Sequence, residues 1–271
     1  MNPAFKNYSV EIILDSLNPY NGVRLTTMKL VYPRFIHAEF MTHRVFSRNA
    51  SSSRAIPIHK VIEQVKNNPA MPLVWGSNKA GMQAGDELEG FDLLASKEHW
   101  LSAIEGATHY AKMLSDFGLH KQHVNRILEP FQLIEVLVTA TDWGNFFELR
   151  CHEDAQPEIH HLACLMRDAM FYSTPVEREM HIPFIDDDLA KPVQRSVARC
   201  ARVSYTLRDG TTDYDKDIEL HDRLVGSNPI HASPAEHQAF AIPSDDFIRN
   251  FRGWEQYRVI LEREKKNERV S

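Results

Sequence analysis

The sequence has few cysteines and no long apolar run. Its 271 residues include only Cys151, Cys164 and Cys200, which form no CxxC pair and indicate reduced thiols rather than a disulfide framework. No apolar stretch approaches the roughly 18 residues of a membrane-spanning helix. The N-terminus also lacks the basic start and apolar core of a signal peptide. We therefore expect a cytoplasmic protein without membrane attachment.

The chain also lacks an excess of positive charge and the common short motifs of nucleotide and metal sites. It carries 31 Lys and Arg against 37 Asp and Glu, a net charge of −6. This balance disfavours non-specific nucleic-acid binding, which requires a strongly basic face. GxGxxG, GxxxxGK[ST], GxSxG and HExxH are all absent from the sequence. We expect no metal site and no partner nucleic acid.

The composition is that of one globular α+β domain. Hydrophobic residues make up 43% of the chain and charged residues 25%, which is ordinary for a folded protein. Periodicity and turn residues predict the elements. These are strands around Val10–Leu14 and over 23–31 joined by a turn at 18–22, a helix from Pro33 to about Arg48, a short helix from Pro57 to before 67, a loop over 67–90, helices over 91–118, 121–129 and 155–171, a linker over 172–192, helices near 193–203 and 214–226, an acidic loop near 206–216, and a last helix from about Asp245. The apolar run 131–141 fits either a helix or a strand.

The stretch 42–54 is the most informative part of the sequence. It holds three arginines and four serines without an acid. Guanidinium and hydroxyl donors at this density, at the end of the predicted helix, favour a site for a phosphate or another anion. A solvated Ser/Arg loop would have the same composition.

Two further clusters combine ordinary helix signals with polar residues. In 149–159, Asp154 suits a helix N-cap and Glu158 the first turn of the following helix, whereas Arg150 follows an apolar run and has no such explanation. In 231–237, Ser233-Pro234 is a common helix start. Neither cluster alone identifies a site.

Five short segments form a set. His43-Arg44 is followed, after seven residues, by Ser52 and then by Arg54; Leu149-Arg150 is followed, after four residues, by Ala-Gln-Pro-Glu-Ile. The others are Arg-Ile-Leu-Glu-Pro at 126–130, Ala-Arg-Val-Ser at 201–204 and Ser-Pro-Ala-Glu-His at 233–237. Together they resemble the flavin-dependent thymidylate synthases, whose signature is Arg-His-Arg, seven residues, Ser, and commonly a further Arg.

The order of the segments departs from this family. Its Ala-Arg-Val-Ser and Pro-x-Glu-His segments precede the Arg-His-Arg signature, whereas here they follow it. The resemblance therefore implies a circularly permuted α+β fold, a small mixed sheet flanked by helices. The expected single domain, 1–271, has its signature segments in 1–171, a linker over 172–195 and permuted segments in 196–271. The 233–240 segment and the strand at 23–31 should then be neighbours.

The resemblance implies conversion of dUMP to dTMP with 5,10-methylenetetrahydrofolate as carbon donor, NADPH as reductant and FAD as hydride carrier. The implied catalytic residues are Arg150, which would activate the pyrimidine, and Ser52. The implied substrate ligands are Ser52, Ser53, Arg54, Arg126 and Arg150. The implied FAD ligands are His43, Arg44, Asn145, Ser204, Ser233 and Glu236. The family also implies a homotetramer with active sites between subunits.

Two alternatives stay open. Thr42 stands where the family has the first arginine of its signature, and Ala50 where many members have Glu. The same fold could therefore end the reaction differently, as a hydroxymethylation of dUMP or dCMP. A nucleic-acid-binding protein that uses the Ser/Arg stretch against phosphates is the second alternative.

Overall fold

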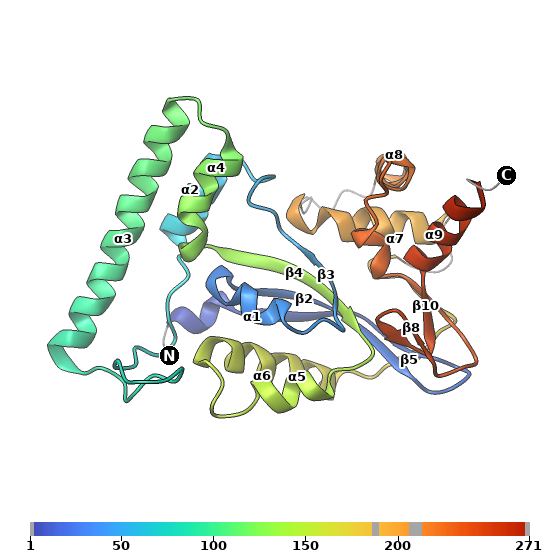
Figure 1. The fold of residues 1–271 in the computed structure, drawn as a ribbon, viewed down its shortest axis with the longest axis horizontal. Helices are drawn as coiled ribbons and strands as arrows, with labels where there is room; N and C mark the ends of the chain where they lie inside the picture. The colour runs from blue at the N-terminus through green and yellow to red at the C-terminus, as the bar shows by residue number, and fades with distance from the viewer. Residues whose placement is uncertain (1–2, 186–189, 206–212, 269–271) are drawn as a thin grey trace.

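The computed structural model describes residues 3–185, 190–205 and 213–268 (Figure 1). Its centre is a five-stranded sheet of order β3-β4-β2-β1-β5. The strands are β1 (Ser9–Leu17), β2 (Arg24–Pro33), β3 (Ser47–Ala50), β4 (Leu133–Ala140) and β5 (Val176–Glu177). All neighbours are antiparallel except β1 and β5. The mixed α+β class and the predicted hairpin are confirmed, and the ambiguous run 131–141 is the strand β4.

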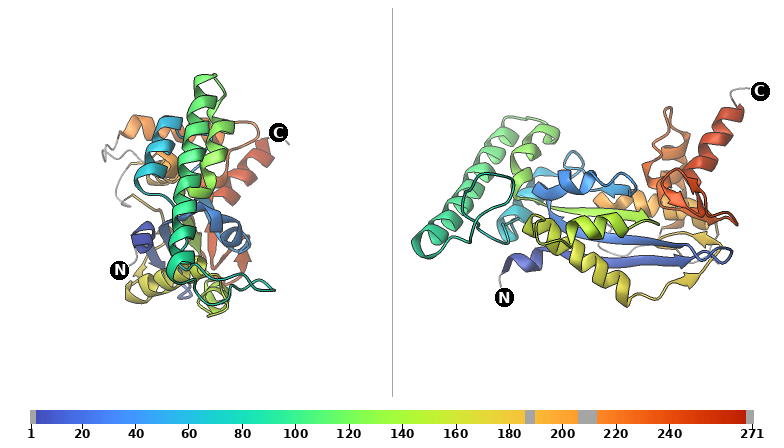
Figure 2. Two further views of the ribbon diagram at one scale, coloured as in Figure 1. Left: turned by 90° about the vertical axis from the view of Figure 1, so that its left-hand side faces the viewer. Right: turned by 60° about the horizontal axis from the view of Figure 1, so that its bottom comes forward.

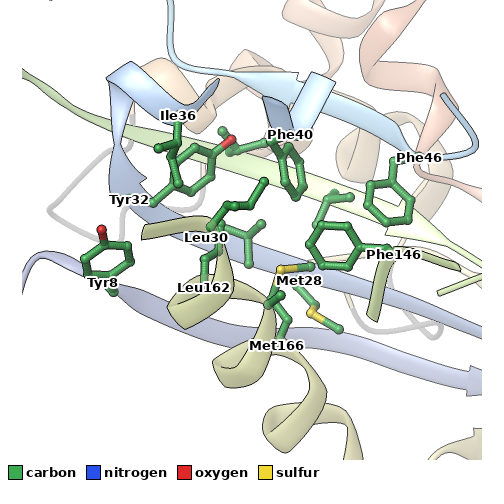
Figure 3. Packing of buried hydrophobic residues seen from close by; sticks show 14 of the residues in the cluster. Tyr8, Met28, Leu30, Tyr32, Ile36, Phe40, Phe46, Phe146, Leu162 and Met166 are labelled. Atoms are coloured by element: carbon green, nitrogen blue, oxygen red, sulfur yellow. The ribbon is translucent and has the colours of Figure 1, made fainter. Parts of the chain in front are cut away.

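One face of the sheet packs on α5 (Gly144–Arg150) and α6 (Pro157–Tyr172). Alternate residues of the strands point to one face of a sheet, and here Met28 and Leu30 of β2 pack with Leu162 and Met166 of α6 (Figure 3). These four side chains are fully buried. Burying side chains of this size stabilises the fold by about 1.5–3 kcal/mol each. The apolar stripe therefore holds α6 against the sheet.

A helical arm forms one end of the molecule (Figures 1 and 2). It consists of α2 (Ile58–Asn67), α3 (Gly90–Asp116) and α4 (Lys121–Leu128), close to the predicted bounds. Val61, Ile104 and Val124 belong to a separate buried cluster within it. The predicted loop between α2 and α3 is confirmed, with one bridge between Gly76 and Glu87.

The C-terminal part packs at the other end, next to β3 (Figure 1). Its elements are β6 (Met180–His181), α7 (Pro192–Ala201), η4 (Arg202–Tyr205), α8 (Tyr214–Gly226), η5 (Ser233–Glu236), β7 (Ala239–Ala241), β8 (Phe247–Ile248), β9 (Phe251–Arg252), β10 (Trp254–Gln256) and α9 (Tyr257–Glu268). Strands β10, β7 and β6 form a second sheet. Of the predicted acidic loop, 206–212 lies outside the described residues.

Three predicted elements are wrong. The helix after Pro33 is only η2 (Arg34–Ile36) and α1 (His37–Met41), and Arg48 lies on strand β3. The linker over 172–192 contains β5 and β6. The last helix begins at Tyr257 rather than near Asp245, because strands β8, β9 and β10 lie within 247–256 and Gly253 among them has a φ of +72°. A helix cannot continue through that position.

The turn of the β1–β2 hairpin is fixed by the C-terminal part. The Asn18 side chain is buried and donates to the carbonyls of Ile242 (3.0 Å) and Gly253 (2.6 Å). The Trp254 indole donates to Val23 O (3.1 Å). Val23 and Leu25 share a buried cluster with Ala239, Phe251 and Trp254. The strand at 23–31 and the 233–240 segment are therefore neighbours, although more than 200 residues separate them.

A chain of buried hydrogen bonds also joins the C-terminal part to the sheet. It runs from Ser16 to His181 (2.8 Å), Thr27 (2.8 Å), Thr139 (2.6 Å) and His237 (2.8 Å), and all five side chains are fully buried. Burial lowers the pKa of both histidines to about 3. The imidazoles are thus neutral, and each can donate one hydrogen bond and accept another.

Among the described residues, no helix combines the length and apolarity needed to cross a membrane.

Candidate active site

Strand β3 places the Ser/Arg stretch at the edge of the main sheet. β3 pairs with β4, Ser47 opposite Thr139 and Ala50 opposite Val136. The chain then turns away, held by a hydrogen bond from Ser51 N to Glu135 O (2.8 Å). The predicted anion site therefore follows an edge strand rather than the end of a helix.

The Arg48 side chain contacts the C-terminal end of α1. Its guanidinium donates to the carbonyls of Met41 and His43, both at 3.1 Å. Thr42 Oγ1 donates to Glu39 O (2.7 Å). Side chains that satisfy the last carbonyls of a helix stabilise its end. The sequence predicts Arg48 only as one of the three arginines of an anion site in 42–54, not as a donor to the carbonyls at the end of α1.

His43 and Arg150 meet on one side of β3. The His43 ring is buried against Phe146, with ring centroids 4.8 Å apart. Arg150 Nε donates to His43 Nε2 (3.0 Å), and an outer guanidinium nitrogen lies 3.4 Å from Thr42 Oγ1. Burial, assisted by the charges of Arg150 and Arg48, lowers the His43 pKa. His43 is therefore neutral at physiological pH, and its Nε2 orients the Arg150 guanidinium.

Glu129, which lies just before β4, contacts three side chains through its carboxylate. Its carboxylate accepts from Ser53 Oγ (2.7 Å) and Arg126 (2.8 Å) and pairs with Arg34 (3.0 Å). Ser53 is buried, whereas the Arg126 side chain is 54% exposed. Arg34 is not among the site residues predicted from the sequence. The hydroxyl of Ser53 is thus engaged with Glu129, and Arg126 reaches solvent from the same cluster.

A cavity of about 930 Å³ lies on the other side of β3. Its first wall includes Arg48, Ser52 and Arg54, and its second wall comes from α7, η4, α8 and η5, including Ser233. Arg54 is exposed and has no hydrogen bond or ion pair with any residue that the structure describes. Among the described lining residues, five carry cationic side chains, Arg48, Arg54, Arg202, Lys216 and Arg223, and one, Glu219, carries a carboxylate. The cavity suits an anionic ligand.

The other residues predicted to bind the flavin do not lie together within one chain. Glu236, at the end of η5, forms an ion pair with Arg258. Arg44 and Asn145 are exposed and do not line the cavity. Ser204 lies in η4, but its side chain is outside the described part of the structure. One chain brings Ser52, Arg54 and Ser233 together, and Arg48 connects this cavity to His43.

The pKa values of Cys151 and Cys200 disfavour a nucleophilic role for these two thiols. Burial raises the pKa of the Cys200 thiol far above its usual range. Burial, with Cys164 nearby, raises the pKa of Cys151 to about 11. A nucleophilic cysteine needs the opposite shift. Within 3–185, 190–205 and 213–268, no group of His, Cys, Asp and Glu could hold a metal ion.

Comparison with known proteins identifies the family. The model of the Thy1 family, described as thymidylate synthase complementing protein, matches residues 23–176. The chain therefore belongs to the Thy1 family. The match covers β2, β3, β4 and the helices between and after them, including both His43 and Arg150.

Two solved structures are similar to part of the chain. Both are crystal structures of the UMP/dUMP methylase PolB from Streptomyces cacaoi. The complex with 5-Br UMP is 18% identical, covers 60% of this chain and 88% of that one, and has a TM-score of 0.48. The complex with 5-Br dUMP is 17% identical, covers 60% and 89%, and has a TM-score of 0.46. No curated protein sequence matches the chain.

Proposed function

We propose that the protein methylates dUMP at C5 to give dTMP, taking the one-carbon unit from 5,10-methylenetetrahydrofolate. Membership in the Thy1 family, through a match that spans Ser52, Arg54 and Arg150, carries this proposal. The name of PolB, a UMP/dUMP methylase, is consistent with it. FAD would carry the hydride and NADPH would supply it.

In this proposal the nucleotide phosphate binds at the end of β3. Arg54 is unpaired there, beside Ser52, on the wall of a cavity with a surplus of positive charge. A guanidinium can hold a phosphate with two parallel charge-assisted hydrogen bonds. Ser53 would help to position the end of β3 through its hydrogen bond to Glu129. Arg126, which is paired with Glu129 but exposed to solvent, would offer the phosphate a second guanidinium.

Arg150 would stabilise the negative charge that develops on the uracil ring. Preorganised cationic donors are effective at this task because they need no reorganisation during the reaction. The neutral His43 ring holds Arg150 Nε at 3.0 Å and so fixes the direction of the guanidinium. Activation by a cysteine is disfavoured by the raised pKa values of Cys151 and Cys200.

The FAD ligands would be His43, Arg44, Asn145, Ser204, Ser233 and Glu236. The cavity fits a large anionic group in both volume and charge. Arg44 and Asn145 are exposed, and so are the neighbouring apolar Val45 and Leu149. A second copy of the chain would cover this face, which supports a homotetramer with sites between subunits. Sedimentation of the active enzyme as a tetramer is the expected result, and an active monomer would contradict it.

We also propose that the chain is a circular permutation of the family fold, with the Ala-Arg-Val-Ser and Ser-Pro-Ala-Glu-His segments moved to the C-terminal part. Arg48 and Asn49 of β3 face Ser233 and Pro234 of η5 across one cavity. This juxtaposition of two segments that are distant in the sequence supports the proposed permutation.

The absorption spectrum of the purified protein tests the flavin assignment. We expect a flavin band after incubation with FAD, bleached anaerobically by NADPH. Failure to take up FAD would contradict the proposal, and so would a bound flavin that NADPH leaves oxidised in the presence of dUMP.

A further inference from the structure

Helix α5 packs against α6 (Figure 1), and two of the three cysteines lie at this contact. Cys151 directly follows α5, and its backbone N–H donates to Phe147 O (2.9 Å). Cys164 lies in the middle of α6, and its side chain is within hydrogen-bonding reach of the Cys151 thiol. Both residues are half-buried, so that small solutes can reach them. Neither thiol has a role in the proposed reaction.

Basic groups of α6 surround Cys164. His160 lies one turn earlier on the helix, and its Nε2 is 3.7 Å from Cys164 Sγ, a hydrogen bond to sulfur. Arg167, one turn later, is exposed and pairs with Asp168 (3.0 Å). The hydrogen bond and charge of Asp168 raise the Arg167 pKa, and negative charge on the two thiols raises it further, so the guanidinium lies within electrostatic reach of both sulfurs. An imidazole and a guanidinium beside a thiol favour its thiolate.

The two thiols are not equivalent. Burial, together with the charge and the hydrogen bonding of Cys164, raises the pKa of Cys151 to about 11. Cys151 therefore keeps its proton and can donate it in a hydrogen bond, which stabilises negative charge on the Cys164 sulfur. Cys164 also has the contact with His160, whereas Cys151 packs against the main hydrophobic cluster. Cys164 is therefore the attacking sulfur of the pair, and Cys151 is the resolving sulfur.

We propose that Cys151 and Cys164 form a redox-active dithiol, which a peroxide converts reversibly into a disulfide. In the first step, the Cys164 thiolate attacks one oxygen of hydrogen peroxide and the O–O bond breaks. The leaving hydroxide takes up the proton that the Cys164 thiol released, which gives water and a sulfenic acid on Cys164. In the second step, the Cys151 sulfur attacks the Cys164 sulfur, the S–O bond breaks, and the hydroxyl leaves as water with the Cys151 proton. The two thiols lose two electrons and two hydrogens, and one peroxide is reduced to two waters.

The first step makes the second one easier. A neutral sulfenic acid on Cys164 no longer carries the negative charge that raises the pKa of Cys151. The two sulfurs are also already in contact, and such proximity corresponds to a high effective concentration. The raised pKa of Cys151 therefore disfavours its attack on a molecule in solution, but not on the neighbouring sulfur.

The disulfide acts on Arg150, the residue before Cys151. Its two sulfurs must approach to about 2.05 Å, closer than in a hydrogen bond between thiols, so the end of α5 moves relative to α6. The Arg150 guanidinium is held by His43 Nε2 at 3.0 Å, and a misplacement of about 1 Å can lower turnover about a hundredfold. We therefore expect lower turnover in the disulfide form. This consequence rests on the proposed function, whereas the disulfide itself does not.

Peptide mapping of the full chain tests the dithiol. The reduced protein is treated with hydrogen peroxide, its remaining thiols are alkylated, and it is digested with trypsin. Both cysteines fall in one peptide, 151–167, because no Lys or Arg lies between them. We expect this peptide to lose two hydrogen atoms and to resist alkylation until dithiothreitol is added. Cys200, which is fully buried, is the control and should stay a thiol. A peptide 151–167 that keeps both thiols, or oxidation of Cys200 before this pair, would overturn the proposal.

Cys151→Ser and Cys164→Ser test the order of the two steps. Without the resolving thiol, oxidation of Cys151→Ser should stop at a sulfenic acid on Cys164, which dimedone traps. Cys164→Ser should trap little dimedone, because the raised pKa of Cys151 leaves little thiolate. Equal trapping in the two variants would contradict the assigned order. Thermal unfolding checks that both variants are folded, and the wild-type peptide map decides the dithiol without them.

Turnover of dUMP by the same samples tests the effect on Arg150. The wild type should lose at least about tenfold in turnover as the disulfide forms and regain it with dithiothreitol, whereas Cys164→Ser should keep its turnover after peroxide. A fully formed disulfide without loss of turnover would overturn the link to Arg150. If the reduced wild type makes no dTMP, the proposed function fails, and the peptide map still decides whether the dithiol exists.

Discussion

The two sides of β3 differ in how their arginines are satisfied. On the cavity side, Arg54 and Arg223 have no partner in the described part of the chain. On the other side, Arg150 donates to a buried, neutral His43. An unpaired guanidinium on a cavity wall is available to an anionic ligand, whereas a guanidinium held by a neutral ring is oriented without losing its charge. In the proposed function, the first arrangement would bind the anionic ligand, and the second would stabilise charge during the reaction.

The largest effect is expected from removing the oriented arginine. Arg150→Ala should lower turnover of dUMP by at least about a hundredfold, the usual cost of removing a preorganised donor, while much of the FAD stays bound. Steady-state kinetics and the flavin content of the purified variant measure the two quantities. His43→Gln, which can still accept from Arg150 Nε, should lose less activity. Equal loss of flavin and turnover in Arg150→Ala would make Arg150 a flavin ligand or a structural residue instead.

The sequence predicted elements that follow from a local pattern and missed those that depend on distant contacts. Strongly periodic segments such as α6 and the β1–β2 hairpin follow from local pattern, and they were predicted with nearly correct bounds. β3 was missed because its pairing partner β4 lies more than 80 residues away. The short strands near Gly253 were missed because they are stabilised by contacts with distant segments: Trp254 pairs with Ala241 and packs with Val23.

Some residues of the candidate site were predicted from local motifs, and others depend on tertiary contacts. Motif spacing predicted Ser52, Arg54 and Arg150. It could not reveal Arg48, which acts on the carbonyls of α1, or Arg34, which reaches Glu129 only after folding. The role of Ser53 as a donor to Glu129 likewise depends on tertiary contact. Partners that are distant in the sequence leave no local signal.

The next effect concerns the unpaired arginine of the first wall. Arg54→Ala should weaken dUMP binding about ten- to hundredfold and leave deoxyuridine binding nearly unchanged, because only the nucleotide carries the phosphate. Calorimetric titration with both ligands makes the comparison. If both ligands weaken alike, Arg54 does not contact the phosphate.

A smaller effect should appear in the pH dependence of stability. The folded-state pKa values of His181 and His237 are about 3, below the value of about 6.5 for an unfolded chain. The unfolded state therefore binds more protons between these pH values, and the free energy of unfolding falls as the pH is lowered from about 6.5 towards 3, by about 1.4 kcal/mol per pH unit for each histidine.

Urea unfolding at several pH values measures this slope. His237→Gln should reduce it by about 1.4 kcal/mol per pH unit, whereas His59→Gln, at an exposed position, is the matched control and should leave it unchanged. An identical slope in wild type and His237→Gln would show that His237 is not held neutral at the junction of the sheet and the C-terminal part.

The smallest effect is expected at Arg126. Its side chain is 54% exposed, and Glu129 keeps Arg34 and Ser53 as partners without it. Arg126→Ala should therefore change the free energy of unfolding by less than about 1 kcal/mol and weaken dUMP less than Arg54→Ala does. Thermal unfolding and titration measure both. A loss of dUMP affinity equal to that of Arg54→Ala would mean that Arg126 leaves Glu129 and binds the phosphate fully.

The identity of the nucleotide product tests the account most directly. The purified protein is incubated with dUMP, 5,10-methylenetetrahydrofolate, FAD and NADPH, and the product is identified by mass spectrometry, with the Arg150→Ala variant as a parallel sample. The account predicts dTMP from the wild type and unreacted dUMP from the variant. A hydroxymethylated nucleotide, or unreacted dUMP in the wild-type sample, would contradict it.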